Sequence, residues 1–343
     1  MDLSDYWYDL PDELIAQHPL ADRTASRMIV ADRAARILRD QQFTDLPSLI
    51  RPGDVVVVNN SKVFPARLYG VTDTGANVEI LLAKDLGNGR WQVLARPEKR
   101  LKTGKRIVFS DELSAEILER AERTGLIIQF DANQDLERLI DDIGQMPLPP
   151  YIKRPRTGSA DDRQRYQTVY AAARGSIAAP TAGLHFTPEM LERMRKAGAE
   201  IENVTLHVGY GTFEPVRAAD LRDHRVLPEE FSISSETAEH LNTAKSDDRR
   251  IIAVGTTTTR TLEGNVAKHG RFEAETGTCG LTITPGYQFK AIDALLTNFH
   301  LPESSLLILV STFGGREFIM KAYGHAVAAR YRFYSYGDCM FIV

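Results

Sequence analysis

The chain has 343 residues, of which 43% are apolar and 26% charged, and its net charge is −4. This length allows a large buried core and about two domains. The charge excludes a protein that coats nucleic acid with its whole surface, but it allows a local basic face.

The cellular compartment is indicated by three features that the sequence lacks: a membrane helix, a secretory signal and a disulfide framework. No apolar run approaches the roughly 20 residues that a membrane helix needs. The N-terminus, MDLSDYWYDLPDE, is acidic, unlike a secretory signal. Cys279 and Cys339 lie far apart and outside any CxxC pair, which argues against a disulfide framework. We therefore expect a cytoplasmic protein with reduced thiols and no membrane association.

The first predicted strand is the apolar run at residues 55–58, which ends in the polar cluster of residues 59–62. Six short alternating runs follow, with the hairpin signal Asn88-Gly89 among them. This pattern is typical of a small antiparallel barrel or sandwich. We predict a mixed α/β main domain of residues 1–63 and 151–343, with an inserted small antiparallel β-barrel domain of residues 64–150.

Beyond the insertion, helices and strands alternate again. The spacing of apolar residues predicts a helix over 165–175, which Gly175 ends. The segment IAAPTAGLHFT at 177–187 fits neither helix nor strand. Thr187-Pro188-Glu189 then has the residues of a helix start, and this helix is predicted to run to about 198. His185 thus lies two residues before a helix N-terminus, where N–H groups can receive an anion.

Polar residues follow several predicted strands. In ENVTLHVGYG, His207 alternates with apolar neighbours and a glycine-rich turn follows. In RIIAVGTTTTR, an apolar strand leads through Gly255 and four threonines into a predicted helix. The later segment NFHLP places His300 in a loop before another helix. Ligands of open α/β sheets bind outside the carboxyl ends of strands, so these segments are candidates for one site.

Four histidines lie near predicted strand ends or turns: His185, His207, His224 and His300. Imidazole is the side chain best suited to proton transfer near neutral pH. The alternative for each of them is a hydrogen-bonded structural role, which is the common one for a single histidine in a loop.

Other chemistries have weaker support in the sequence. HExxH, histidine pairs on one helix face and zinc-finger spacings are missing, so we expect no metal. A GxSxG elbow, a GxGxxG loop and a P-loop are missing as well. The run Thr256–Thr259 suits a ribose or a carboxylate, but it is equally typical of a capped turn between strand and helix.

Basic residues gather in two segments, RPEKRLKTGKR at 96–106 and KRPR at 153–156. Most such runs are solvated faces. Two of them in one acidic chain also fit contact with RNA phosphates. The predicted RNA-binding residues are Lys99, Arg100, Lys102, Lys153 and Arg154.

Several long blocks together resemble one family. They are AAPTAGLHFTPE, VTLHVGYGTFEPV, AVGTTTTRTLE, PGYQFKAIDALLTNFHLPESSLLILVS, GGREF and YRFYSYGD, with DLPDELIAQHPLADRTASRMIV and PARLYG nearer the N-terminus. In this order, they resemble the S-adenosylmethionine:tRNA ribosyltransferase-isomerases of the queuosine pathway, over the whole length.

The resemblance implies an unusual reaction. S-adenosylmethionine, here a substrate, would donate its ribosyl moiety to 7-aminomethyl-7-deazaguanine at the wobble position of tRNA. Epoxyqueuosine-tRNA would form, with release of adenine and methionine. The partner would be tRNA that carries this base, and the family fold is a mixed α/β domain with a small β-barrel. We expect a monomer.

The resemblance also implies roles for residues. A base must remove a proton beside the sulfonium, and an acid must assist the departure of adenine. His185 and His207 are the first candidates, and His300 is the third. The expected substrate-binding residues are Thr181, Gly183, Gly209, Gly211, Thr256, Thr257, Arg260, Asn298, Arg316 and Asp338.

Two segments depart from the family pattern. Where members usually read NDTRV, the chain has Asn60-Ser61-Lys62-Val63, and after His224-Arg225 it has Val226-Leu227-Pro228 instead of a histidine and a serine. Lysine cannot form the bidentate fork of arginine. Two alternatives therefore stay open: a relative that acts on another acceptor, and a nonenzymatic tRNA-binding module of the same fold.

Overall fold

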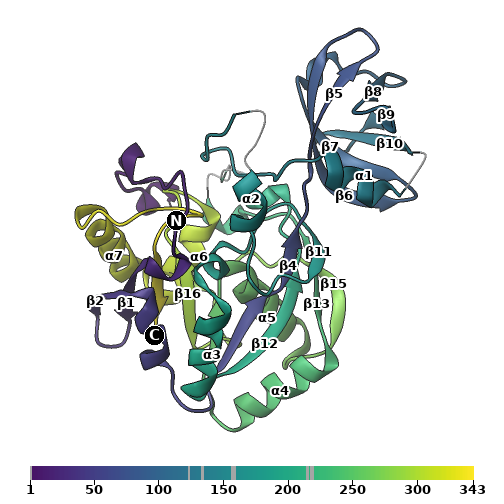
Figure 1. Cartoon of the computed structure of the whole chain (residues 1–343). Helices are drawn as coiled ribbons and strands as arrows, with labels where there is room; N and C mark the ends of the chain where they lie inside the picture. The colour runs from purple at the N-terminus through teal and green to yellow at the C-terminus, as the bar shows by residue number, and fades with distance from the viewer. Residues whose placement is uncertain (1, 123, 133–134, 156–159, 214–215, 217–219) are drawn as a thin grey trace.

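The structure is a computed structural model that describes residues 2–122, 124–132, 135–155, 160–213, 216 and 220–343. It consists of a main α/β domain and a small β-barrel that lies to one side (Figure 1). The predicted fold class is therefore confirmed. Within the described ranges, no helix is both long enough and apolar enough to cross a membrane.

The main domain is built on a mixed sheet that has nine strands among the described residues, in the order β15-β13-β12-β3-β14-β16-β17-β1-β2. The four central strands β12, β3, β14 and β16 are parallel, so their carboxyl ends meet at one edge. The strands are β1 (Arg27–Asp32), β2 (Ile37–Gln42), β3 (Val55–Asn59), β12 (Glu200–Leu206), β13 (Glu229–Ile233), β14 (Ile251–Val254), β15 (Glu275–Cys279), β16 (Ala294–Asn298) and β17 (Cys339–Ile342).

Helices cover both faces of this sheet. On one face lie α4 (Ser235–Ser246), α5 (Thr256–His269), α6 (Ser305–Gly314) and α7 (Arg316–Ala328), and on the other lies α3 (Pro188–Lys196). The predicted start of α3 is confirmed, because the Thr187 hydroxyl accepts a hydrogen bond from the Met190 N–H at 3.2 Å. The helix predicted from the threonine run is α5.

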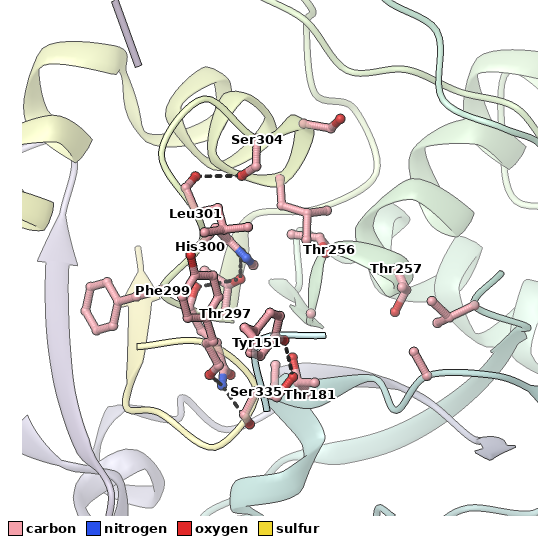
Figure 2. A pocket seen from close by; sticks show the side chains of 18 of the residues that line it. Tyr151, Thr181, Thr256, Thr257, Thr297, Phe299, His300, Leu301, Ser304 and Ser335 are labelled. Carbon is pink, nitrogen blue, oxygen red and sulfur yellow. Dashed lines mark hydrogen bonds between the residues drawn. The ribbon is translucent and has the colours of Figure 1, made fainter. Parts of the chain in front are cut away.

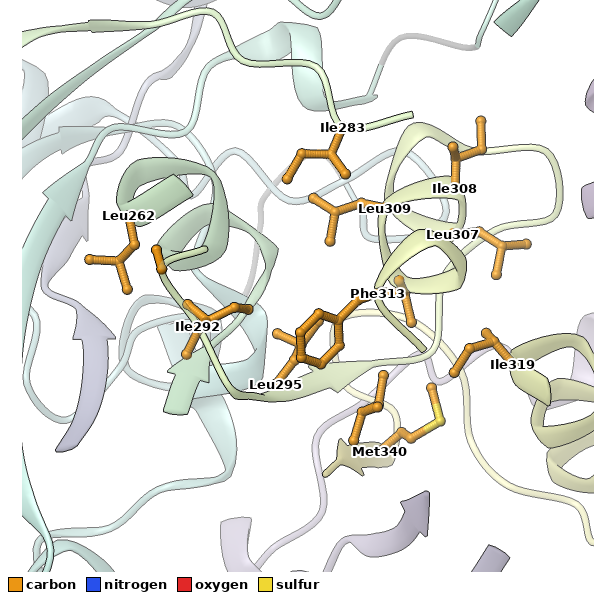
Figure 3. Packing of buried hydrophobic residues seen from close by; sticks show 14 of the residues in the cluster. Leu262, Ile283, Ile292, Leu295, Leu307, Ile308, Leu309, Phe313, Ile319 and Met340 are labelled. Carbon is orange, nitrogen blue, oxygen red and sulfur yellow. The ribbon is translucent and has the colours of Figure 1, made fainter. Parts of the chain in front are cut away.

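The central strand β3 connects the two cores of the main domain. Val55 and Val57 pack in the core below α5 and α6, whereas Val56 and Val58 pack in the core below α3. Figure 3 shows the first of these cores, where side chains of α5 and α6 meet those of the sheet. Each fully buried valine or leucine contributes about 1.5–3 kcal/mol through removal from water. The unbroken apolar run of β3 thus follows from burial on both faces.

The barrel closes from six strands within the described part of the insertion, in the order β10-β7-β6-β5-β8-β9. They are β5 (Arg67–Thr72), β6 (Asn77–Gly87), β7 (Arg90–Arg96), β8 (Arg106–Val108), β9 (Leu113–Arg120) and β10 (Leu126–Ala132), followed by α1 (Leu136–Ile143). All six coincide with predicted runs. Asn88 and Gly89 form the predicted turn with positive φ values of 55° and 73°.

A short parallel pair, β4 (Ser61–Val63) and β11 (Ala173–Ser176), lies where the chain passes between the two domains. The helix predicted over 165–175 is wrong. Helix α2 (Ala160–Arg165) ends where that helix should begin, and β11 pairs with β4 instead. Gly175 has a φ of 153° and lies against the ring of His207, so tertiary pairing overrides the local helical spacing. The exact domain boundaries at 63 and 151 stay a prediction.

Candidate functional site

A cavity of about 320 Å³ lies at the carboxyl ends of the parallel strands. Residues 255–257 reach it from the end of β14, residues 297–306 from the end of β16, and Val208 from beyond β12. Figure 2 shows Thr256 and Thr257 across the cavity from Thr297 and His300. The cavity therefore occupies the place where α/β sheets bind ligands.

One wall of the cavity is the irregular segment 177–187. Ala178, Ala179 and Ala182 line the cavity, and their small side chains leave its backbone open to a ligand. The segment turns as a 3₁₀ helix, Thr181–His185. Gly183 lies behind this wall, where a Cβ would come within 2.0 Å of the Tyr170 hydroxyl. The predicted binding residue Thr181 lines the cavity, whereas Gly183 makes room for Tyr170.

Two helix N-termini point their first residues at the cavity. Helix α5 begins after Gly255, which has a φ of 91° and provides no side-chain cap. Thr256 and Thr257 line the cavity, while the hydroxyls of Thr258 and Thr259 bond back to carbonyls four residues earlier. The first residues of α6 line the cavity as well. Unpaired N–H groups and the helix dipole make such ends suitable for a carboxylate or phosphate.

The buried residue Asn59 orients the Thr257 hydroxyl. Its Nδ2 donates to the Leu206 carbonyl at 2.9 Å and to Thr257 Oγ1 at 3.2 Å. Its Oδ1 accepts from the N–H groups of Ser61 and Leu206, both at 3.0 Å. Because Thr257 Oγ1 accepts this bond, its own proton is available to an acceptor in the cavity.

His185 lies behind the cavity wall and contacts the cavity through Asn298. The Asn298 Nδ2 donates to the Tyr334 carbonyl at 2.9 Å, so its Oδ1 faces His185 Nε2 at 3.1 Å. Nε2 must therefore carry the ring proton, and Nδ1 accepts from the Ser26 hydroxyl at 2.9 Å. Burial lowers the pKa of His185 to about 4, which keeps the ring neutral at pH 7.

His300 is the predicted catalytic histidine that lines the cavity. Its Nε2 lies 2.9 Å from Thr297 Oγ1. Its backbone is fixed by two tyrosines, because its N–H donates to the Tyr323 hydroxyl at 3.0 Å and its carbonyl accepts from the Tyr8 hydroxyl. Burial lowers the pKa of His300 to about 3, so this ring is also neutral.

The other two histidines lie outside the cavity lining. His207 Nδ1 lies 2.7 Å from Ser61 Oγ, and its ring packs against Gly175. His224 Nε2 lies 2.8 Å from the hydroxyl of Ser305, which does line the cavity. Burial lowers the pKa of both rings. His207 thus contacts the segment Asn60-Ser61-Lys62, in which the sequence departs from the family pattern.

Arg260 and the two glycines that follow β12 are grouped around Glu229. Arg260 forms a buried ion pair with Glu229 and donates to the carbonyls of Leu281, at 3.1 Å, and Cys279, at 3.3 Å. The Gly209 N–H donates to Glu229 Oε1 at 2.9 Å. Gly211, like Arg260, lines a separate small hollow. Arg260, Gly209 and Gly211, all predicted to bind substrate, therefore lie around Glu229 and not in the lining of the cavity.

Arg316 and Asp338 also lie outside the cavity lining. Arg316 pairs with Asp5 at 2.5 Å on the surface. Asp338 is buried and accepts hydrogen bonds from the N–H groups of Arg27, at 2.9 Å, and Arg332, at 2.8 Å. Burial raises the pKa of Asp338. Asp338 thus joins β1 to the loop before β17, which is a structural task.

Sequence reasoning missed an aromatic wall of the cavity. The rings of Tyr151 and Tyr334 stack with their centroids 4.5 Å apart, and Tyr151 Oη lies 2.6 Å from Ser335 Oγ. Tyr334 has a φ of 68°, which is rare for a bulky residue and directs its carbonyl to Asn298. The block YRFYSYGD contains Tyr334 and Ser335, but nothing in its local pattern indicates the backbone turn.

Sequence reasoning also missed Glu303. Among the described residues that line the cavity, it is the one charged side chain, and it lies in the loop before α6. It is part of the block NFHLPESS, but an acidic residue at a helix start is common enough to raise no suspicion. In the cavity, its carboxylate can attract a cationic part of a ligand.

The predicted RNA-binding residues divide between two places. Lys99 and Lys102 are exposed on the barrel, and the side chain of Arg100 lies outside the described part of the structure. Lys153 and Arg154 line a groove between the barrel and the main domain. Within the described ranges, no group of three or more histidine, cysteine or acidic residues is placed to hold a metal ion.

Comparison with known proteins identifies the family. Residues 3–342 match the family described as queuosine biosynthesis protein. The chain belongs to this queuosine biosynthesis family. It is 48% identical, over the whole of both chains, to the S-adenosylmethionine:tRNA ribosyltransferase-isomerase of Syntrophotalea carbinolica.

Two further relatives agree with this membership of the queuosine biosynthesis family. A Trichlorobacter lovleyi protein of the same name is 46% identical over 99% of both chains. The crystal structure of S-adenosylmethionine tRNA ribosyltransferase from Thermotoga maritima is 38% identical, with a TM-score of 0.57 over 99% of this chain and 100% of that one. The resemblance found in the sequence is thus confirmed.

Proposed function

We propose that the protein transfers and isomerises the ribosyl moiety of S-adenosylmethionine onto 7-aminomethyl-7-deazaguanine at the wobble position of tRNA. The product is epoxyqueuosine-tRNA, and adenine and methionine are released. A cytoplasmic location and a monomeric state stay our predictions. The names of the full-length relatives support this activity.

The observation that carries the proposal is the meeting of four family-like blocks around one cavity. Residues 178–182, 255–257, 297–306 and 334–335 are far apart in the sequence, yet they line the same cavity. A protein that kept the fold only to bind RNA does not require these blocks to enclose a small-molecule site.

The cavity offers a place for each end of S-adenosylmethionine. The methionine carboxylate binds at the N-terminus of α5, which has no side-chain cap and places Thr256 and Thr257 in the cavity lining. Glu303 lies in the same lining and attracts the cationic ammonium or sulfonium. The stacked pair Tyr151 and Tyr334 provides an aromatic wall for a purine-like ring.

His300 is the proton-transfer residue that we favour, because it lines the cavity and is neutral. A neutral imidazole can accept the proton from the carbon beside the sulfonium, whose positive charge acidifies that position. Asn298 orients the substrate, and His185 is a positioning residue that fixes Asn298. His207 as a base remains the alternative, which its variant tests below.

Adenine release tests the proposal directly. The purified chain is incubated with S-adenosylmethionine and tRNA that carries the aminomethyl base, and adenine is followed by chromatography. Release that depends on both substrates supports the proposal. Binding of tRNA with no adenine release supports a nonenzymatic module, and equal release with tRNA that has unmodified guanine indicates another acceptor.

A further inference from the structure

A second hollow, a groove of about 1010 Å³, runs between the barrel and the main domain. Its barrel bank includes residues of β5, β6 and β7, and its other bank is the proline-rich return segment at 145–155. Pro150 lines both this groove and the cavity, and the groove residue Ile177 is followed by the cavity residue Ala178. The groove thus adjoins the cavity at Pro150.

The acidic side chains in the groove are neutralised locally. Glu79 pairs with Arg67 across neighbouring barrel strands. Asp162 pairs with Arg154 at 2.9 Å. The third acidic side chain of the described lining, Glu98, pairs with an arginine of β9 at 2.6 Å. None of these carboxylates is therefore available to repel an anionic partner.

Three basic side chains of the groove form no ion pair within the described part of the chain. One of them, Arg163, donates to the carbonyls of Asp141, at 2.9 Å, and Gly144, at 2.6 Å, which leaves Arg96 and Lys153. Arg96 projects from the barrel bank and Lys153 from the return segment, and both are exposed. Neither forms an ion pair with another residue in the described part of the chain. With five basic and three acidic side chains in its described lining, the groove is positive in a chain of net charge −4. This contrast favours an anionic partner.

The groove also offers rings on which bases can stack. Tyr69 of β5 and Tyr210 are half-buried and line it, and Tyr210 packs against the barrel core, to which Ile177 also belongs. Single-stranded RNA is bound through such a combination of cations for phosphates and aromatic faces for unstacked bases. An acidic peptide would use the cations but would leave the rings without a matching partner.

We propose that this groove holds the single-stranded RNA loop that presents the acceptor base to the cavity. The inference rests on the proposed function and adds where the RNA lies. Phosphates contact Arg96 and Lys153 from opposite banks, and the acceptor base enters the cavity past Pro150. The exposed pair Lys99 and Lys102, although basic, lies outside the groove lining and does not lead to the cavity.

The test measures RNA affinity of the full chain over a series of salt concentrations. The probe is an anticodon stem-loop RNA, with a duplex of equal length and polyglutamate as competitors. In the double variant R96E/K153E, we expect weaker binding and a salt slope lower by about 2, one for each lost phosphate contact. R96Q/K153Q removes the charges without reversing them and should lower the slope equally.

A matched control is R39E/K321E, which also reverses one arginine and one lysine. Both residues are exposed, on β2 and α7, away from the barrel (Figure 1). We expect this control to bind RNA as the wild type does. Calorimetric binding of S-adenosylmethionine verifies that each variant keeps an intact cavity.

Three results would overturn the inference: unchanged affinity in both groove variants, an equal loss in the control, or a loss confined to K99E/K102E. Displacement of the RNA by polyglutamate as readily as by free stem-loop would also contradict it. The proposed function fails separately, if the wild type binds the stem-loop but releases no adenine from S-adenosylmethionine. Adenine release together with normal RNA binding by the groove variants would refute the groove alone.

Discussion

The cavity and the groove are neighbours that differ in electrostatic character. The cavity contains hydroxyls, amides and two helix N-termini, and the histidine in its lining is kept neutral by burial. The groove has exposed charges and an open course between two domains. The contrast separates two tasks. Oriented dipoles act most strongly where water is excluded. Exposed cations can bind a polyanion, but this binding weakens as the salt concentration rises.

The largest expected effect tests whether the cavity is the site of the reaction. His300→Ala removes the histidine that lines the cavity, and we expect kcat to fall by about 10²- to 10⁴-fold. The matched variant is His224→Ala, whose ring contacts Ser305 from outside. Adenine release under saturating substrate is the measurement, with circular dichroism to verify folding. A decrease in kcat of less than tenfold would show that His300 is not the proton-transfer residue.

The same residue predicts a pH dependence. A base acts in its deprotonated form, and burial lowers the pKa of His300 to about 3. Activity that depends on this ring is therefore present above pH 3 and is lost only as the pH falls toward that value. We expect kcat to show no acid limb between pH 5 and pH 8. An acid limb near pH 6.5 that disappears in His300→Ala would contradict the neutral buried ring.

The next effect tests whether His185 acts through Asn298. We expect His185→Ala to lower kcat by about 100-fold, because a small misplacement of an orienting group costs that much. His185→Gln, which can still donate to Asn298 Oδ1, should recover part of the loss. Adding Asn298→Ala to His185→Ala should lower kcat little further, because each change alone already disrupts the hydrogen-bonded pair of His185 and Asn298. Additive losses, or an altered pH profile in His185→Gln, would indicate a direct catalytic role.

A smaller effect is expected at the N-terminus of α5. Thr257→Val keeps the shape of the side chain and removes the hydroxyl that Asn59 orients. A hydrogen bond to a charged group such as the methionine carboxylate contributes at least about 1.5 kcal/mol, so we expect KM for S-adenosylmethionine to rise by at least about 10-fold. Thr258→Val is the control, because that hydroxyl bonds to the Val254 carbonyl at 2.7 Å. Equal effects on KM would show that stability rather than binding had changed.

The smallest expected effect concerns His207. Because its ring contacts Ser61 and lies outside the cavity lining, we expect His207→Ala to keep kcat within about threefold of wild type. Initial rates of adenine release decide the point. A loss in the range typical of general bases, about 10²-fold or more, would restore His207 as the base and weaken the assignment of His300.

The fold was predictable where a residue pattern had one physical explanation. The apolar run before Asn59 is typical of a strand buried on both faces, and Asn88-Gly89 is a strong signal for a tight hairpin turn; the structure confirms both. The helix over 165–175 failed because its apolar spacing was local, whereas β4 and β11 pair across more than a hundred residues. Long-range pairing has no signature within a window of eleven residues.

The site was predictable by segment and less so by side chain. Strand ends pointed to the blocks that line the cavity, among whose residues are Thr181, Thr256, Thr257, Asn298 and His300. The direction of each side chain depends on partners elsewhere in the chain, as His185 shows with Ser26 and Asn298. The left-handed backbone of Tyr334 likewise has no cue in the sequence.

The double-sided strand β3 has a consequence for how insertions are tolerated. Because successive valines face different cores, a shift of the strand by one residue exchanges every contact between the two sides of the sheet. It would also turn Asn59 away from Thr257. Two unrelated packing surfaces thus fix one register, and that register sets the direction of a hydroxyl in the lining of the cavity.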